Sequence, residues 1–208
     1  MRVVIYGSGG HAKVVADLLI AAGEDVVGFV DDEPSREGAE VLGLPVLGGW
    51  AWLEAAEDVG AALGIGSNQV RCALAKRCAA SGVPLVTGVH PRAVVARSAT
   101  LAEGAMVMAG ALINPDARVG RGAIVNTGAV VEHDVVIGDF AHLSPNATTG
   151  GGARLDDQAH VGVGAVLLPL ARVGARSIVG GGAVVTKAVP ADVVAAGVPA
   201  RIIRRIER

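Results

Sequence analysis

The sequence predicts an α/β, Rossmann-like N-terminal domain over residues 1–88, followed by an all-β parallel β-helix over residues 89–208. Two observations lead to this prediction. Residues 2–32 contain an apolar strand, a Gly-rich turn, a helical pattern and a second apolar strand. From Val89 to Val189, the sequence repeats every six residues without an insertion. A repeat of this length indicates a solenoid, because each unit buries its apolar side chains only against its neighbours.

The hexapeptide repeat has an aliphatic residue at its first position and usually Ala at its fifth. Sixteen of the seventeen first positions are aliphatic, and Thr149 is the exception. An alternation such as Ala129-Val130-Val131 is typical of a short strand whose two ends face inward. The intervening residues are often Gly, Asn, Asp or Glu, which favour a corner. With three strands and corners per coil, residues about 18 apart stack on neighbouring coils, about 4.8 Å apart.

Composition limits the functions to consider. The 208-residue chain is 51% hydrophobic but only 2% aromatic, as expected for a narrow prism filled by aliphatic side chains. Its net charge of −2 gives no basis for nucleic-acid binding. No apolar run of about 18 residues occurs, and the N-terminus reads as a strand and not as a signal peptide. We therefore expect a cytoplasmic protein without a membrane partner, in which Cys72 and Cys78 are buried, reduced thiols.

The N-terminal part reads as alternating strands and helices. The expected strands are Arg2–Tyr6, Val26–Val30, Ala61–Ile65 and Pro84–Thr87. Helices are expected over Lys13–Ala22, within residues 33–60, and from a Gly66-Ser67-Asn68 cap to about Ala80. Strand, turn, helix and strand at this spacing are typical of a mononucleotide-binding unit.

A Gly-rich turn, Gly7-Ser8-Gly9-Gly10-His11-Ala12, joins the first strand to the first helix. Gly7 and Gly9 would let a phosphate approach the backbone, and the helix N-terminus would favour its negative charge. Asp31 or Asp32, at the end of the second strand, is placed to hydrogen-bond a ribose or a base edge. One such unit favours a nucleotide or nucleotide-sugar over NAD. The alternatives are a tight turn without a ligand and, for at least one acid, a merely exposed carboxylate.

One corner of the repeat, Glu132-His133-Asp134, carries a histidine between two carboxylates. A histidine outside the core titrates near neutral pH and can act as a base, and a carboxylate can hold its tautomer. Gly151 follows 18 residues later, so its backbone N–H would lie beside His133 and could stabilise an oxyanion. These residues predict an acyl-transfer site, and an exposed histidine without a role is the open alternative.

Two further histidines, His142 and His160, lie 18 residues apart and are expected to stack on the outer face of adjacent strands. Zinc sites need three or four ligands, so no metal is predicted here. His142 is expected to line a cleft or to face a neighbouring chain. Asn126, stacked under Ser144, is expected to support the same cleft.

The sequence resembles the bacterial sugar acyltransferases of the sialic-acid O-acetyltransferase (NeuD) and UDP-amino-sugar N-acetyltransferase (PglD) type, which are hexapeptide-repeat acyltransferases. The resemblance covers essentially the whole chain. It rests on these segments: Tyr6–His11, Phe29–Asp32, Ile65–Asn68, Asn126–Gly128, Val131–Asp134, His142–Pro145 and Gly197–Arg201. The resemblance implies a left-handed β-helix that forms a homotrimer, a nucleotide-sugar in the N-terminal domain, and acetyl-CoA in the groove between subunits.

The resemblance also implies roles for single residues. His133 matches the general base and Gly151 the amide that meets the acetyl carbonyl, while Asp134 matches the acidic partner, with Glu132 as a rival. The implied acceptor contacts are His11, Asn126 and His142, and the implied nucleotide contacts are Ser8, Gly9, Asp31 and Asp32. The implied CoA contacts are Gly151, Gly162, Gly180, Gly197 and Pro199.

Three functions remain open at the level of sequence. The first is transfer of an acetyl group from acetyl-CoA to an amine, the 4-amino group by resemblance, of a UDP-linked amino-sugar. The second is O-acetylation of sialic acid or another sugar hydroxyl. The third is a nucleotide-sugar-binding scaffold without catalysis, against which the intact Glu-His-Asp corner argues.

Overall fold

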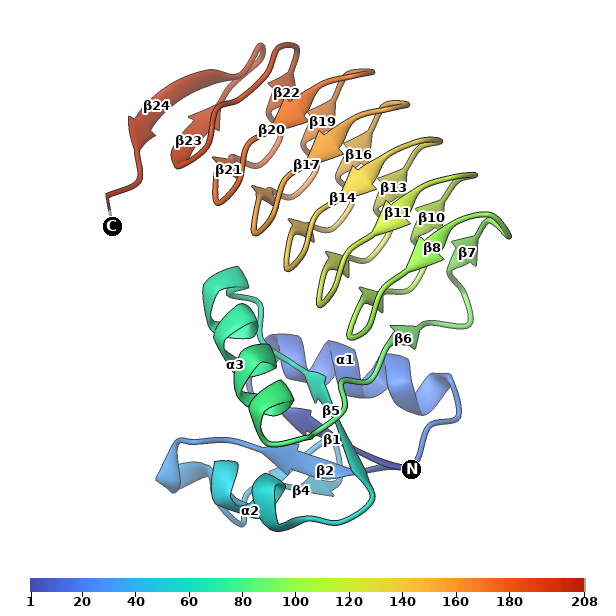
Figure 1. Cartoon of the computed structure of the whole chain (residues 1–208), viewed down its shortest axis with the longest axis vertical. Helices are drawn as coiled ribbons and strands as arrows, with labels where there is room; N and C mark the ends of the chain where they lie inside the picture. The colour runs from blue at the N-terminus through green and yellow to red at the C-terminus, as the bar shows by residue number, and fades with distance from the viewer. Residues whose placement is uncertain (208) are drawn as a thin grey trace. The chain divides into compact units, whose positions relative to one another are not determined.

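A computed structural model of the chain describes residues 1–207, so Arg208, the last residue of the part predicted as β-helix, lies outside the described residues. The chain separates into two compact units, Met1–Pro91 and Arg92–Arg208. The first unit contains helices and a small sheet, and the second is a stack of short-stranded coils (Figure 1).

The first unit is built on a three-stranded parallel sheet with the strand order β2-β1-β5. Helix α1 packs on all three of these strands, whereas α3 packs on β5 and α2 on β2. The elements in chain order are β1 (Arg2–Tyr6), α1 (Gly10–Ala21), β2 (Val26–Val30), the 3-10 helix η1 (Pro34–Arg36), β3 (Glu40–Val41), β4 (Leu44–Pro45), α2 (Trp50–Ala55), β5 (Val59–Leu63), α3 (Asn68–Ala80) and β6 (Gly88–Val89).

Four details of this unit differ from the sequence-based prediction. Strand β5 covers Val59–Leu63 and not the expected Ala61–Ile65, because the strand pairs with β1 from Arg2 to Tyr6. Helix α1 begins at Gly10, earlier than expected, because Gly9 already serves as its N-cap. The antiparallel pair β3–β4 was not predicted, since two-residue strands carry no readable alternation. The strand expected at Pro84–Thr87 is wrong: only a single bridge forms, between Ala61 and Leu85. Pro84 lacks an amide hydrogen, so it cannot donate to a ladder.

The second unit is a β-solenoid whose coils carry two-residue strands. Residues 18 apart pair in parallel, as in Val130 with Thr148 and His142 with His160. One face has the strand order β7-β10-β13-β16-β19-β22, the next β8-β11-β14-β17-β20, and the third includes β9-β12-β15-β18-β21-β23, with the antiparallel β24 at its edge. The predicted period and stacking are therefore confirmed.

The strands occupy the sixth and first positions of successive hexapeptides. Their bounds are β7 (Val94–Val95), β8 (Thr100–Leu101), β9 (Met106–Val107), β10 (Leu112–Ile113), β11 (Arg118–Val119), β12 (Ile124–Val125), β13 (Val130–Val131), β14 (Val136–Ile137), β15 (His142–Leu143), β16 (Thr148–Thr149), β17 (Arg154–Leu155), β18 (His160–Val161), β19 (Val166–Leu167), β20 (Arg172–Val173), β21 (Ile178–Val179), β22 (Val184–Val185), β23 (Val193–Ala196) and β24 (Arg201–Arg205).

A left-handed backbone conformation turns each corner. From Gly104 to Gly182, the fourth residue of every hexapeptide has a φ between 55° and 73°. Glycine adopts this conformation at little cost, and Asn and Asp tolerate it better than most other residues. Asp134 is one of these residues, with a φ of 61°. The corner geometry therefore fixes the direction in which the Asp134 side chain leaves the coil.

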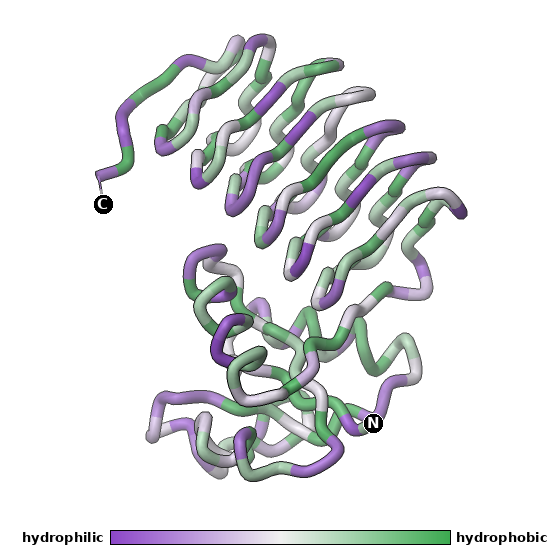
Figure 2. Tube along the Cα trace, in the orientation of Figure 1, coloured by the Kyte–Doolittle hydropathy of each residue, from purple (hydrophilic) through white to green (hydrophobic). Residues whose placement is uncertain are grey.

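The solenoid interior is filled by the aliphatic first positions and the small fifth positions, such as Val131 and Ala129, both fully buried. Figure 2 shows polar and apolar residues alternating along the coils. Cys72 and Cys78 are buried, as predicted. Within residues 1–207, we find no helix with the length and apolar character needed to cross a membrane.

Candidate active site

His133 and Asp134 form a hydrogen-bonded pair at the corner between β13 and β14. The Nδ1 atom of His133 lies 2.8 Å from Oδ2 of Asp134. Both side chains are more than half exposed, at 63% and 66%. The hydrogen bond to Asp134 has the largest effect and raises the pKa of His133 above its usual value of 6.5. Desolvation opposes it, and the charges of Asp134 and Glu132 add smaller upward effects on this pKa. Because Asp134 occupies Nδ1, the outer nitrogen, Nε2, is left to meet a substrate.

Glu132 interacts with the backbone of this corner and not with the ring. Its Oε2 atom accepts a hydrogen bond from the His133 amide at 3.2 Å. Of the two carboxylates that flank His133 in sequence, Asp134 is therefore the one that orients the imidazole.

Gly151 lies directly against the His133 ring. A Cβ atom at Gly151 would be 2.5 Å from Nε2 and 2.6 Å from Cε1 of His133. The amide of Gly152 donates to the His133 carbonyl at 2.9 Å, which ties the two corners together. The imidazole of His133 therefore occupies space that a side chain at residue 151 would need.

The Gly151 amide is available to a ligand. Third-position amides lie outside the coil-to-coil ladder and bond to side chains where one is stacked above: Arg121 N–H donates to Asp139 at 2.8 Å. The residue stacked above Gly151 is Pro169, which offers no acceptor side chain. Within residues 1–207, the Gly151 amide donates no hydrogen bond. A free N–H beside a base is the arrangement that an oxyanion requires.

Asn126, which follows β12, and His142, which lies in β15, form a hydrogen-bonded pair between adjacent coils. Nδ2 of Asn126 lies 2.9 Å from Nε2 of His142, and both residues are at least nine-tenths buried. Oδ1 of Asn126 accepts from the Thr127 amide at 2.8 Å, so its NH₂ group must face the histidine. His142 therefore accepts at Nε2 and carries its proton on Nδ1. One coil on, Ser144 and His160 repeat this pairing at 3.0 Å.

Two of the predicted CoA contacts, Gly162 and Gly180, continue the series of Asn126 and Ser144 at intervals of 18 residues. A Cβ at Gly162 would lie 2.6 Å from the Gly181 amide, and one at Gly180 would lie 2.9 Å from Cβ of Ala196. Both positions therefore exclude a side chain for packing reasons alone. Gly197 and Pro199 lie in the turn between β23 and β24, where the Val198–Pro199 bond is cis.

Ser8 and Asp31 close the Gly-rich turn in the first unit. Oδ2 of Asp31 accepts from the Ser8 amide at 2.8 Å and from its hydroxyl at 2.5 Å. Arg36 donates to the Ser8 hydroxyl and carbonyl, both at 2.9 Å. Burial works to raise the pKa of Asp31, but the hydrogen bonds from Ser8 and Glu33 and the charge of Arg36 outweigh it, so the pKa is lowered. Gly9 follows as the N-cap of α1 without a side-chain cap.

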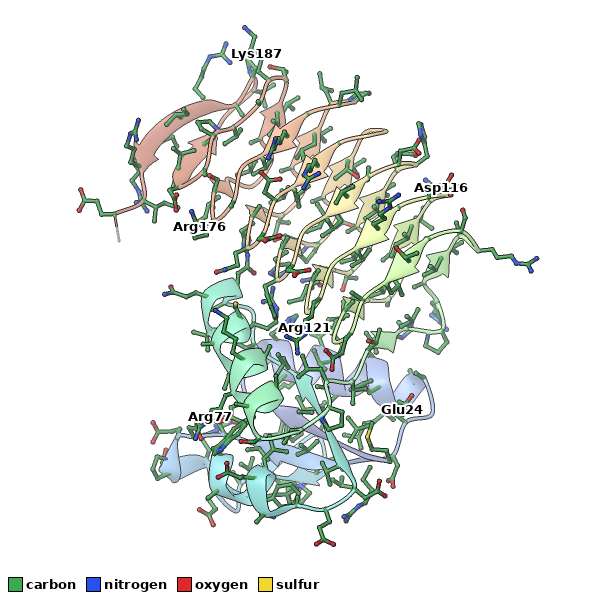
Figure 3. The ribbon with its side chains drawn as sticks, viewed as in Figure 1. Glu24, Arg77, Asp116, Arg121, Arg176 and Lys187 are labelled. Carbon is green, nitrogen blue, oxygen red and sulfur yellow. The ribbon has the colours of Figure 1, made fainter. Side chains whose placement is uncertain are left out.

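Asp32 belongs to a separate group around Trp50. It accepts from the Tyr6 hydroxyl at 2.6 Å and from the Trp50 amide at 2.9 Å. Arg77, labelled on α3 in Figure 3, lies 4.0 Å over the Trp50 ring and 3.7 Å from Asp32. Asp31 and Asp32 thus have different protein partners, and their assignment as nucleotide contacts stays a prediction.

His11 on α1 and Arg71 on α3 are neighbouring basic residues that lie largely buried in the first unit. Burial, with a smaller effect of the Arg71 charge, lowers the pKa of His11 to about 4. Burial also lowers the pKa of Arg71 to about 10. Arg71 donates to the carbonyls of Ile65 and Gly66 at 3.0 and 3.2 Å. It thereby holds the segment before α3, a role that no local pattern in the sequence indicates.

No group of three or more His, Cys, Asp or Glu side chains within residues 1–207 is arranged to hold a metal ion. The corner around His133 instead presents a proton acceptor, an orienting carboxylate and an unused amide. Those three components are what direct acyl transfer to a nucleophile needs.

Comparisons with known proteins agree with this chemistry. Residues 2–78 match the model of the PglD N-terminal domain. The UDP-N-acetylbacillosamine N-acetyltransferase of Bacillus subtilis (strain 168) is 41% identical over 111 residues. That match spans 52% of this chain and 51% of the enzyme, about half the length of the curated relative.

Two solved structures match nearly the whole chain. A mutant of perosamine N-acetyltransferase from Caulobacter crescentus, in complex with CoA and GDP-perosamine, is 43% identical, with a TM-score of 0.94 over 98% of this chain and 97% of that chain. The acetyltransferase domain of PglB from Neisseria gonorrhoeae FA1090, in complex with acetyl coenzyme A, is 33% identical, with a TM-score of 0.91 over 97% and 98%.

An α/β unit joined to a hexapeptide β-solenoid, with a His-Asp pair and a bare amide on adjacent coils, defines a two-domain hexapeptide-repeat acyltransferase. Within that class, the chain belongs to the family of PglD-type sugar N-acetyltransferases.

Proposed function

We propose that the chain is an acetyl-CoA-dependent N-acetyltransferase that acetylates an amine of a nucleotide-linked amino-sugar. The observation that carries this proposal is the His133 corner, with Asp134 2.8 Å from Nδ1 and Gly151 against the opposite edge of the ring. Membership of the family supports acetyl transfer to nitrogen.

In the proposed mechanism, Nε2 of His133 accepts a proton from the attacking amine. The nitrogen forms a bond to the thioester carbon, and the carbonyl electron pair moves to oxygen, where the Gly151 N–H stabilises the charge. Asp134 stabilises the imidazolium that results. The C–S bond then breaks, the CoA thiolate leaves, and His133 returns its proton to that sulfur. Cys72 and Cys78 are both buried, which supports direct attack without an acyl-cysteine.

The remaining site residues are proposed in three groups. We assign the nucleotide to the Gly-rich turn and the ends of β1 and β2, with the contacts Ser8, Gly9, Asp31 and Asp32. We assign the contacts with the acceptor sugar to His11, Asn126 and His142. CoA is assigned to Gly151, Gly162, Gly180, Gly197 and Pro199. By family resemblance, the assembly is a homotrimer with active sites between subunits.

The acceptor is proposed to be a nucleotide-linked 4-amino-sugar. The sequence resemblance favours a UDP-sugar, and so does the similarity to the B. subtilis enzyme. A GDP-sugar is the second candidate, since the C. crescentus enzyme that matches 98% of this chain was solved with GDP-perosamine. O-acetylation of sialic acid or of another sugar hydroxyl is a third possibility that the assay below separates.

The test is a CoA-release assay with acetyl-CoA against UDP- and GDP-linked 4-amino-sugars, their 4-hydroxy counterparts and sialic acid. We expect turnover only with a 4-amino-sugar, and a thermal shift with either UDP or GDP but not with both. Turnover of hydroxyl acceptors alone would replace the proposal with O-acetylation. Binding of a nucleotide without any CoA release would indicate a scaffold.

A further inference from the structure

Between residues 96 and 180, the coil-to-coil hydrogen-bond ladder of the solenoid is interrupted at one residue, and that residue precedes His133. The amide at the second position of a hexapeptide regularly donates to a backbone carbonyl of the next coil. Between residues 96 and 180, such bonds are donated by Ala96, Ala102, Met108, Asn114, Gly120, Asn126, Gly138, Ser144, Gly150, Asp156, Gly162, Leu168, Gly174 and Gly180. Glu132 is the one second-position residue in this range whose amide does not donate to a backbone carbonyl.

The Glu132 amide donates instead to a side chain, Oγ1 of Thr149, at 3.3 Å. The same hydroxyl donates to the Val130 carbonyl at 3.2 Å. Thr149 therefore bridges the main chain on both sides of Val131. Its side chain is fully buried, and it is the single non-aliphatic first position of the repeat.

The stacking of the coils does not require this hydroxyl. Valine has nearly the volume of threonine, and other second-position amides pair with backbone carbonyls above aliphatic residues. A hydroxyl in an apolar core costs free energy unless both its donor and its acceptor capacity are used. The interior threonine is therefore explained by the two hydrogen bonds that its hydroxyl forms with the backbone at Glu132 and Val130.

Thr149 is also close in the chain to Gly151 and hydrogen-bonded to the residue before His133, so it can affect the position of both. It belongs to β16, which leads directly into Gly150 and Gly151, and it is hydrogen-bonded to the residue that precedes His133. A change at this one side chain would alter the position of the base relative to the free amide.

We propose that Thr149 is a positioning residue for His133, whose hydroxyl withdraws the Glu132 amide from the ladder and so sets the imidazole against Gly151. This proposal rests on the proposed function, in which His133 is the general base. Misplacement of a catalytic group by about 1 Å can cost up to about 10²-fold in rate.

The test is Thr149→Val, which keeps the volume, removes the hydroxyl and lets the Glu132 amide return to the ladder. We expect kcat to fall about tenfold, the KM for acetyl-CoA to stay within about twofold, and the Tm to be maintained. Thr149→Ser keeps the hydroxyl, so its kcat should stay within about threefold of the wild type despite a lower Tm. A wild-type kcat in Thr149→Val, or equal losses in both variants, would overturn the proposal.

Ser177 offers a matched control for the loss of a buried hydroxyl. Its Oγ atom donates to the Pro190 carbonyl at 2.6 Å and accepts from the Val193 amide at 3.1 Å, and the residue is fully buried. Ser177→Ala should lower the Tm and leave kcat unchanged. A fall in kcat as large as that of Thr149→Val would mean that loss of core order, and not positioning, causes both effects.

A second readout separates this proposal from the proposed function. The imidazole of His133 is titrated by NMR without substrate in the wild type and in Thr149→Val, with His133→Gln to assign its signal. We expect the apparent pKa of His133 to differ between the two proteins. Superimposable titrations would overturn the positioning role, whatever the activity. A wild type that acetylates no amino-sugar would defeat the proposed function, while a shifted titration would still support the positioning of His133.

Discussion

At the scale of the residue, His133 owes its chemistry to two neighbours that act on opposite edges of its ring. Asp134 is held by the left-handed corner, at a φ of 61°, and fixes Nδ1. Gly151 leaves room for Nε2 and keeps an unused amide beside it. Neither neighbour works through burial, because the pair is largely exposed in the single chain. The orientation of the His133 imidazole therefore depends on its hydrogen bond to Asp134 and on the space at Gly151.

The Asp134 hydrogen bond makes a prediction about pH. It favours the imidazolium and raises the pKa of His133, so a base that must be unprotonated loses activity as the pH falls through this raised pKa. In Asp134→Asn the pKa should fall, so the acid limb of kcat/KM should move to lower pH while the maximal kcat decreases. A pH series of initial rates measures both effects.

The matched control for this prediction is Asp116→Asn. Asp116 occupies the same corner position one coil earlier, with a φ of 62°, and projects from the corner labelled in Figure 3. Its charge is not among the effects that raise the pKa of His133, so its replacement should leave the pH profile unchanged. An acid limb that stays in place in Asp134→Asn would contradict the orienting role of that carboxylate.

Gly151→Ala tests the contact between the two coils. The added Cβ would lie 2.5 Å from Nε2 of His133, so the ring must move, although the amide is retained. We expect kcat to fall by about 10- to 100-fold. In a His133→Ala background, the same substitution should cost little more, because the clash is gone. Losses that multiply independently across this double-mutant cycle would contradict the contact.

At the scale of the element, the N-terminal unit depends on a buried arginine that connects α3 to the segment before it. Arg71 is 1% exposed, donates to the carbonyls of Ile65 and Gly66, and reaches Oδ1 of Asn68 at 2.9 Å. Ser67 caps α3 by accepting from the Val70 amide at 3.4 Å. Together these contacts define residues 65–68, one of the segments on which the family resemblance rests.

Replacement of Arg71 should therefore be costly. Arg71→Met removes three hydrogen bonds from a charged donor and leaves buried acceptors unpaired, so we expect a loss of about 3 kcal/mol in the free energy of unfolding. Arg154, an exposed arginine paired with Asp156 at 2.8 Å, is the control: Arg154→Met should cost less than about 1 kcal/mol. Urea denaturation of both variants measures the difference, and equal losses would contradict a structural role for Arg71.

The elements also show what the sequence could predict. The hexapeptide period is set by backbone stacking and by the volume of the core, so a pattern of Val, Leu and Ala was sufficient to place the strands and the His133 corner. The strand expected at Pro84–Thr87 failed because apolar composition does not reveal that only Leu85 finds a bridge partner. Thr149 was visible as an exception, yet its purpose depends on hydrogen bonds that only coordinates reveal.

The first unit was harder to predict for a physical reason. Its polar contacts join residues far apart in the sequence, such as Arg36 with Ser8 and Tyr6 with Asp32. No local periodicity encodes such pairings. The Gly-rich turn and the acidic pair were recognisable, but which of these side chains would bind each other could not be inferred from their spacing.

For the whole molecule, we propose that the active site lies between the subunits of a homotrimer, in which case the oligomer is part of the catalyst. We expect sedimentation to give a homotrimer, with about three times the chain mass of 20.7 kDa. Specific activity should fall on dilution below the concentration at which trimers dissociate. A fully active monomer would contradict a site shared between subunits.

The role of His133 as the general base is tested by the turnover of His133→Ala with the preferred amino-sugar in the CoA-release assay. General base catalysis contributes about 10²–10⁴-fold, so kcat should fall by that factor. Binding of acetyl-CoA and the oligomeric state should be retained, because His133 lies outside the solenoid core. A variant that folds, binds acetyl-CoA and turns over within tenfold of the wild type would contradict the assignment of His133 as the base.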